Sequence, residues 1–179
     1  MTVFVAGVHA VGKSHLCQQY ARAFSTLHES SSGLIRKERA QSDWSYDKKV
    51  VDVDGNQRAL QNAVRRIALE KVQLLLDGHF VLIGQDSNFV RLGEPIFADL
   101  NLSGVILLEA GEELIASRLS ARDSSVSAVD ISHFLQAERE QAQLVCENLR
   151  LPLHILHEPS FEGFSHIAHT LFKSAKMEY

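Results

Sequence analysis

The chain is poor in the residues and runs that mark several protein classes. It has only 2 cysteines, Cys17 and Cys146, which cannot build a disulfide framework or a metal knuckle of paired cysteines. Reduced thiols of this kind fit a cytoplasmic protein best. No apolar run is long enough to cross a membrane, and we expect no signal peptide because the first motif begins at Gly7. The composition therefore argues against disulfide-rich secreted proteins and membrane-spanning proteins.

An excess of positive charge is also missing. The formal net charge of −4 argues against a general nucleic-acid binder, although it is compatible with a local basic pocket. The 179 residues are 45% hydrophobic and 22% charged, which is the size and composition of one globular domain with its own core. We therefore expect a single domain over residues 1–179 that binds neither nucleic acid nor a membrane.

One stretch carries a strong chemical signal. Residues 7–14 read Gly-Val-His-Ala-Val-Gly-Lys-Ser, which is the G-x-x-x-x-G-K-[ST] pattern of a phosphate-binding loop. Gly7 and Gly12 let the backbone take positive φ and approach an anion, so that N–H groups converge on phosphate oxygens. Lys13 can reach the β- and γ-phosphates of ATP, and the Ser14 hydroxyl can ligate Mg²⁺. The loop therefore predicts ATP and Mg²⁺ as ligands.

The surrounding pattern alternates apolar strands with helices. Residues 27–33 read as a turn and residues 85–93 as a polar loop, while Asn56 is a plausible N-cap. We expect strands at 2–6, 72–77, 103–109 and 151–156, and the proline of the last indicates a sheet edge or a strand start. We expect helices at 14–24, 34–40, 57–70, 94–100, 112–122, 130–148 and 164–176. This alternation predicts an α/β fold, a three-layer α/β/α sandwich with a central parallel sheet.

An acidic residue ends the second expected strand. In a protein with a phosphate loop, such a strand end is where a partner of Mg²⁺ or of its water shell lies, so we predict this role for Asp77. His79 follows at the same rim and could contact the substrate or the metal shell, or be structural.

The sequence argues against two other metals. Residues 50–56 lack the spacing and the distal glutamate of a calcium loop. Near the C-terminus, four histidines have no carboxylates at ligand spacing beside them, which argues against a zinc site there: His154, His157, His166 and His169.

Two polar stretches could meet a second substrate, and each has a plainer alternative. Arg36 could hold a phosphate bidentately, or it could belong to a solvated charged face of its helix. Trp44 and Tyr46 could stack on a base or could simply pack. The sequence leaves these alternatives open.

Taken together, these motifs resemble the nucleoside-monophosphate kinases. The segments GVHAVGKS, LLLDGH, VILLEA followed by EELIASRL, then Arg-Asp and a later ERE, are most similar to the archaeal-type adenylate kinases with a short lid. The resemblance spans residue 1 to about residue 158, and the phosphate loop is its most specific part. It implies a P-loop kinase fold with an acceptor-binding segment at 30–65 and a short lid at 119–130.

The resemblance also implies individual roles. Lys13, Ser14 and Asp77 would serve the phosphates and Mg²⁺, and Arg36 would meet the monophosphate acceptor. Arg118 would lie over the adenine, and Arg122 and Arg139 would close on the transferring phosphoryl group. The residues expected to bind ATP are Gly7, His9, Ala10, Val11, Gly12, Lys13, Ser14, His15 and Arg118.

The favoured function is therefore an ATP- and Mg²⁺-dependent phosphotransferase acting on a small acceptor, with a nucleoside monophosphate as the expected acceptor. Several arginines converging on one anion suit this chemistry, because phosphoryl transfer needs positioning and charge neutralisation. The family pattern is broken at His9 and Ala10, in the lid, which holds few cations, and at 85–94, which lacks a Gly/Pro-rich acceptor loop. The sparse lid and the missing acceptor loop slightly favour the alternative, an ATP-binding regulator or ATPase subunit that controls a protein partner. No arginine-finger segment or sensor motif indicates an AAA-type motor.

Overall fold

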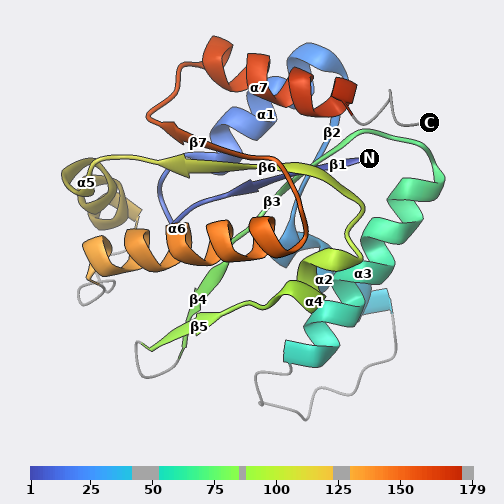
Figure 1. Cartoon of the computed structure of the whole chain (residues 1–179), viewed down its shortest axis with the longest axis horizontal. Coiled ribbons are helices and arrows are strands. Elements are labelled where there is room, and N and C mark those ends of the chain that lie inside the picture. Colours follow the sequence, from blue (N-terminus) through green and yellow to red (C-terminus); the bar gives the residue numbers. More distant parts are fainter. Residues whose placement is uncertain (42–52, 85–87, 123–129, 175–179) are drawn as a thin grey trace.

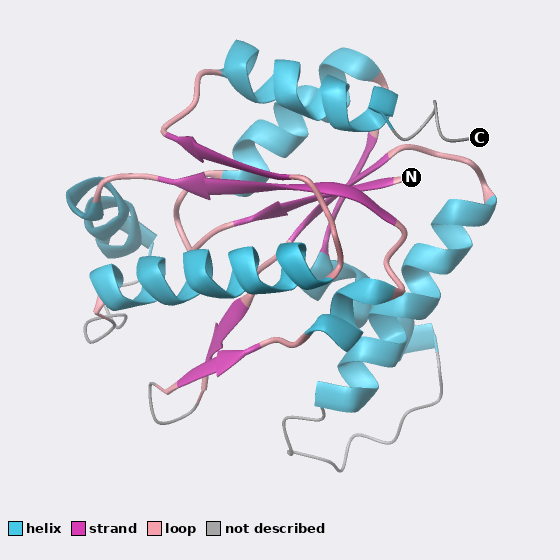
Figure 2. Cartoon of the chain, in the orientation of Figure 1, coloured by secondary structure: helices cyan, strands magenta, loops and turns pink. Residues whose placement is uncertain are grey.

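A five-stranded parallel sheet forms the centre of the molecule (Figures 1 and 2). The computed structural model describes residues 1–41, 53–84, 88–122 and 130–174. The strands lie in the order β2 (Leu27–Ser30), β3 (Leu74–Asp77), β1 (Thr2–Ala6), β6 (Leu102–Glu109) and β7 (Leu153–His157), and every neighbouring pair is parallel. Because β1 is central and buried on both faces, its nearly continuous apolar sequence is the one expected of an inner parallel strand.

Helices cover both faces of this sheet. In Figure 1, α1 and α7 lie above the sheet and α6 lies below it. Their bounds, with those of the other helices, are α1 (Lys13–Phe24), α2 (Ser31–Gln41), α3 (Val53–Leu69), α4 (Glu94–Ala98), α5 (Glu112–Arg122), α6 (Ile131–Asn148) and α7 (Phe161–Ser174). None of the helices within the described ranges is long and apolar enough to cross a bilayer.

The alternating side chains of β1 join two hydrophobic cores. Val3 and Val5 pack in the core that contains side chains of α1 and α7, whereas Phe4 and Ala6 pack in the core formed with α3, α4 and the C-terminal half of α6. Successive residues of a strand point to opposite faces, so one short strand fixes both helix layers to the sheet. The prediction of a three-layer α/β/α sandwich is confirmed.

Three local expectations were wrong. Residues 27–30 form strand β2 instead of a turn, and the expected polar loop at 85–93 contains a strand of an antiparallel hairpin, β4 (Val81–Ile83) with β5 (Phe89–Arg91). Asn56 lies inside α3, where its Oδ1 accepts a hydrogen bond from Arg39 at 2.5 Å instead of capping the helix. For β2 and Asn56, a partner distant in the sequence decides the local structure.

Candidate active site

The phosphate loop joins the central strand β1 to helix α1. Gly7 has a φ of 141° and Gly12 a φ of 113°, and a Cβ on Gly7 would lie 2.4 Å from the Leu108 carbonyl oxygen. Both positions therefore require glycine, for conformation at both and for space at Gly7. Ala10, at the tip of the loop, also has a positive φ of 62°, which is uncommon for a residue with a side chain.

Lys13 is buried and folds back over the loop. Its Nζ donates to the carbonyl oxygens of Gly7 at 2.6 Å and Val8 at 3.0 Å, and lies 3.2 Å from His79 Nε2. Burial, followed by the charges of Lys13 and His9, lowers the pKa of His79 to about 2. His79 is therefore neutral at physiological pH, and its Nε2 accepts from the lysine ammonium group.

Ser14 and Asp77 meet beside the loop, as the sequence led us to expect. The Ser14 hydroxyl donates to Asp77 Oδ2 at 3.1 Å, and Asp77 is only 6% exposed. The pairing of β1 with β3 sets Val5 opposite Asp77, which brings this carboxylate to the edge of the sheet where the loop begins. A hydroxyl and a carboxylate oxygen at one point are donors that Mg²⁺ accepts, so the residues present fit this ion.

A cavity of about 490 Å³, here called the large cavity, opens on the other side of Asp77 and His79. Apolar side chains of β1, α3 and α4 form much of its wall, including Phe4, Leu60 and Phe97. Arg36 lines it from α2, and within the part of the chain that the structure describes no side chain pairs with its guanidinium. The large cavity therefore combines an apolar wall with an unpaired cation, which suits a small anionic molecule.

A second depression, of about 280 Å³ and here called the loop groove, lies between the phosphate loop and α5. Arg118 Nη1 donates to the carbonyl oxygens of Ala10 at 3.2 Å and Val11 at 3.0 Å. His15 on α1 and Pro159 after β7 also line the loop groove. The structure thus brings Arg118 and His15 to the loop, and their roles in binding ATP stay a prediction.

Of the two arginines expected to close on the phosphoryl group, Arg139 is paired with a carboxylate in this structure. Arg139 donates from Nε to Glu109 Oε1 at 2.6 Å, and its Nη2 contacts the second oxygen of that carboxylate. The bonds to Glu109 raise the pKa of Arg139, and this residue lines neither the large cavity nor the loop groove as the described residues form them. The side chain of Arg122, residues Trp44 and Tyr46, and most of the predicted lid lie outside the described residues.

Two residues at the site, Glu138 and His28, were not predicted from the sequence. Glu138 on α6 is 1% exposed, and its carboxylate accepts from the backbone N–H groups of Gly7 at 3.1 Å, Phe80 at 2.9 Å and Val81 at 2.7 Å. Burial raises the pKa of Glu138, and these N–H partners oppose that rise. Its position, four residues after the buried Phe134, was the available signal. His28, whose Nε2 lies 2.7 Å from Asp77 Oδ2, is the other contributor.

Solved structures with the same fold include small-molecule kinases. The chain is similar to a sugar kinase from Janibacter sp. HTCC2649 (16% identity, TM-score 0.58, covering 96% of this chain and 94% of that one). It is also similar to a gluconokinase from Sinorhizobium meliloti 1021 (16%, 0.52, 99% and 95%) and to a shikimate kinase from Acinetobacter baumannii (13%, 0.51, 99% and 93%). At these identities the similarity shows the fold.

Sequence comparison identifies the family. A search of curated proteins found no match to the chain. The family model of an AAA domain matches residues 6–134, a range that begins directly before the phosphate loop and ends in α6. The chain belongs to this AAA domain family of P-loop proteins.

Proposed function

We propose that this protein transfers the γ-phosphoryl group of ATP to a small anionic acceptor held in the large cavity. One observation carries the proposal. Asp77 and His79 line the large cavity, and the same two side chains contact Ser14 and Lys13 of the phosphate loop. The acceptor space and the phosphate site therefore share a wall, as a direct transfer between two bound molecules requires.

The nucleotide side of the reaction uses the loop and the loop groove. The N–H groups of the loop and the first turn of α1 receive the phosphates, because a helix N-terminus favours an anion. Lys13 exchanges its carbonyl partners for phosphate oxygens, and Arg118 and His15 flank the base in the loop groove. Mg²⁺, which Ser14 and Asp77 would hold, supplies neutralisation of the phosphate charge.

The acceptor side is defined by its charge distribution. Arg36 gives the large cavity a cation suited to a phosphate or a carboxylate, and Asp77 and His79 mark the end next to the loop. The sequence favours a nucleoside monophosphate. The names of the similar structures add sugars, gluconate and shikimate, so hydroxy acids belong among the candidates. Both the nucleotide and the hydroxy acids carry an anionic group that Arg36 could bind, although in a nucleoside monophosphate this group also carries the reacting oxygen.

One observation favours the alternative function, an ATP-binding regulator of a protein partner. The Arg139 guanidinium is already paired with Glu109, so fewer cations are ready to meet a transferring phosphoryl group. Such a protein would bind ATP, or hydrolyse it slowly, without phosphorylating any small molecule.

Turnover of Mg-ATP separates the two functions. ADP and the phosphorylated product would be followed separately against nucleoside monophosphates, sugars and hydroxy acids. We expect a product with one acceptor and a loss of at least about 100-fold in kcat for Lys13→Ala, because this cation serves the transferring phosphoryl group. Lys173→Ala, an exposed lysine on α7, is the matched control. ADP release that is indifferent to every acceptor would support the regulator instead.

Arg36→Ala tests the acceptor site itself. We expect the KM of the acceptor to rise about tenfold or more while the KM of ATP stays the same, since loss of a hydrogen bond to a charged group costs about 1.5–3 kcal/mol. Arg58→Ala, an exposed arginine on the neighbouring helix α3 that does not line the cavity, is the control. Equal effects of the two variants, or a rise in the KM of ATP, would contradict the assignment of the large cavity.

A further inference from the structure

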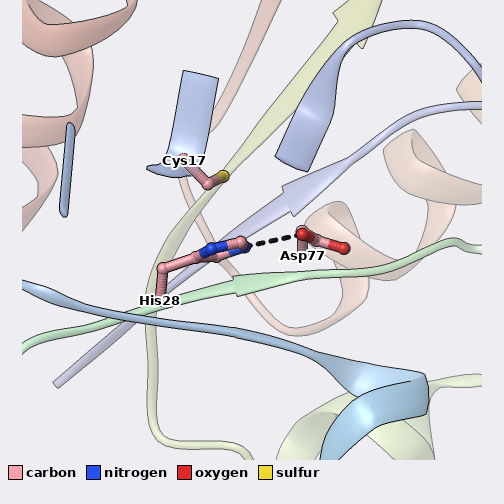
Figure 3. Close-up of side chains that lie close together, drawn as sticks. All are labelled: Cys17, His28 and Asp77. Carbon is pink, nitrogen blue, oxygen red and sulfur yellow. Dashed lines mark hydrogen bonds and ion pairs between the residues drawn. The ribbon is translucent and has the colours of Figure 1, made fainter. Parts of the chain in front are cut away.

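Three side chains from separate elements lie close together (Figure 3), and one of them, Asp77, also contacts Ser14 of the phosphate loop. Cys17 comes from α1, one turn after Lys13, while His28 comes from β2 and Asp77 from the end of β3. The Cys17 sulfur, one His28 ring nitrogen and one Asp77 oxygen all lie within 4.8 Å of one another. Cys17 is fully buried, and the side chains of His28 and Asp77 are 12% and 8% exposed. The proposed phosphoryl transfer uses only Asp77 of these three.

We propose that Cys17, His28 and Asp77 form a site for a thiophilic divalent cation of the Zn²⁺ class. The donor set decides the class of ion. One sulfur, one imidazole nitrogen and one carboxylate oxygen are the three ligand types that zinc takes in proteins, whereas Mg²⁺ prefers oxygen alone. Three protein ligands leave a fourth tetrahedral position for water or another small ligand.

The contacts around Cys17, His28 and Asp77 indicate how the three side chains would hold an ion and from which side it would reach them. The cation would take the place of the hydrogen bond between His28 Nε2 and Asp77 Oδ2, which now holds these atoms 2.7 Å apart. Cys17 would bind as the thiolate and His28 as the neutral ring, and the displaced protons would pass to solvent. Asp77 lines the large cavity, so this cavity gives the ion a path. The Ser31 hydroxyl donates to the Asp77 carbonyl at 3.0 Å and helps to fix this strand end.

Occupancy of this site would change the neighbouring magnesium site, an inference that rests on the proposed function. Asp77 Oδ2 is the atom that accepts from Ser14 and also the atom that faces His28. A thiophilic cation bound to Asp77 draws that carboxylate away from the Mg²⁺ position. We therefore expect zinc to inhibit phosphoryl transfer by competing for one shared carboxylate.

Cadmium titration tests the metal site without any substrate. Cd²⁺ replaces zinc in sulfur-containing sites and gives an ultraviolet absorption band when it binds a thiolate. The full chain would be titrated with Cd²⁺ in the absence of nucleotide, acceptor and Mg²⁺, and we expect one ion per chain. Cys17→Ser should weaken binding at least about 100-fold, since even partners that only orient metal ligands are worth about 10–100-fold. Cys146→Ser, which removes the other buried cysteine, is the matched control and should bind normally.

The results that would overturn the metal site differ from those that would overturn the proposed function. The proposal is overturned by absence of the thiolate band in the wild-type chain, by unchanged affinity in Cys17→Ser, or by equal losses in both cysteine variants. Circular dichroism establishes whether each variant is folded, and His28→Gln, expected to weaken Cd²⁺ binding at least tenfold, decides the matter if Cys17→Ser does not fold. Zinc binding with undiminished turnover would overturn the competition for Asp77. Absence of turnover counts against the proposed function alone, because the titration contains no substrate.

Discussion

His79 lies between the phosphate loop and the large cavity, and its lowered pKa predicts how the stability of the protein depends on pH. Its pKa is about 2 in the folded protein and near its ordinary value of 6.5 in the unfolded chain. Between these values the unfolded chain binds a proton that the folded protein does not, so acidification favours unfolding. We expect the wild type to lose stability as the pH falls through 6.5, and His79→Gln to lose less, because glutamine can accept from Lys13 but does not titrate.

Urea unfolding at about pH 7 and about pH 5 measures this difference, on either side of the ordinary histidine pKa. His166→Gln, which removes an exposed histidine of α7, should retain the pH dependence of the wild type. Identical pH dependence in His79→Gln and the wild type would show that His79 is not kept neutral by the fold.

Among individual residues, the sequence predicted those site residues that belong to a local sequence pattern. Gly7, Lys13 and Ser14 belong to one short pattern, and Asp77 ends an apolar run. His28 and Glu138 could not be found in this way, because their partners are 49 and 131 residues away in the sequence. Arg139 shows the opposite case, because the resemblance assigned its charge to the transferring phosphoryl group, whereas in the structure it pairs with the buried carboxylate of Glu109.

At the scale of elements, Glu138 ties helix α6 to the phosphate loop and to the start of β4. Its carboxylate accepts from Gly7 in the loop and from Phe80 and Val81 at the hairpin. In Glu138→Gln, an amide NH₂ group replaces one acceptor oxygen and faces N–H donors, so at least one buried donor loses its partner. We expect a loss of about 1–3 kcal/mol in the free energy of unfolding.

The same variant should also bind ATP more weakly, because the first residue of the loop loses its anchor. Chemical denaturation and an ATP-binding isotherm measure the two effects. Glu147→Gln, an exposed glutamate on α6, is the control and should change the free energy of unfolding by less than about 0.5 kcal/mol. Full stability of Glu138→Gln would mean that the three N–H groups find other partners.

Elements differed in how far the sequence could predict them. Helix α5 has the expected bounds because an acidic first turn, a helical period and a following break mark both ends. Strand β2 has 4 residues and no period of its own, and it is a strand because it pairs with β3. The hairpin of β4 and β5 also depends on a contact outside itself, because Phe89 stacks on Phe134 of α6. The sequence of the hairpin alone does not predict this contact.

For the whole molecule, ligand binding should appear as increased stability. A ligand that binds only the folded state at 100 times its Kd adds about 2.7 kcal/mol to the free energy of unfolding. We expect saturating Mg-ATP to raise the Tm of the wild type and of Lys173→Ala, and to raise that of Lys13→Ala little. Thermal denaturation with and without Mg-ATP measures this shift. A wild-type Tm that does not respond to Mg-ATP would contradict nucleotide binding at the loop.

The central position of β1 separates the two recognition tasks. The large cavity draws its wall from α2, α3, α4 and the end of β3, on one side of β1, whereas the loop groove uses α5, β6 and the turn after β7, on the other. Within the described residues, the phosphate loop lines both, the large cavity through His9 and the loop groove through Val11 and Gly12. Under the proposed function, mutations can therefore accumulate on the acceptor side without a matching change on the nucleotide side, and a gene duplicate can acquire a new acceptor while it continues to use ATP.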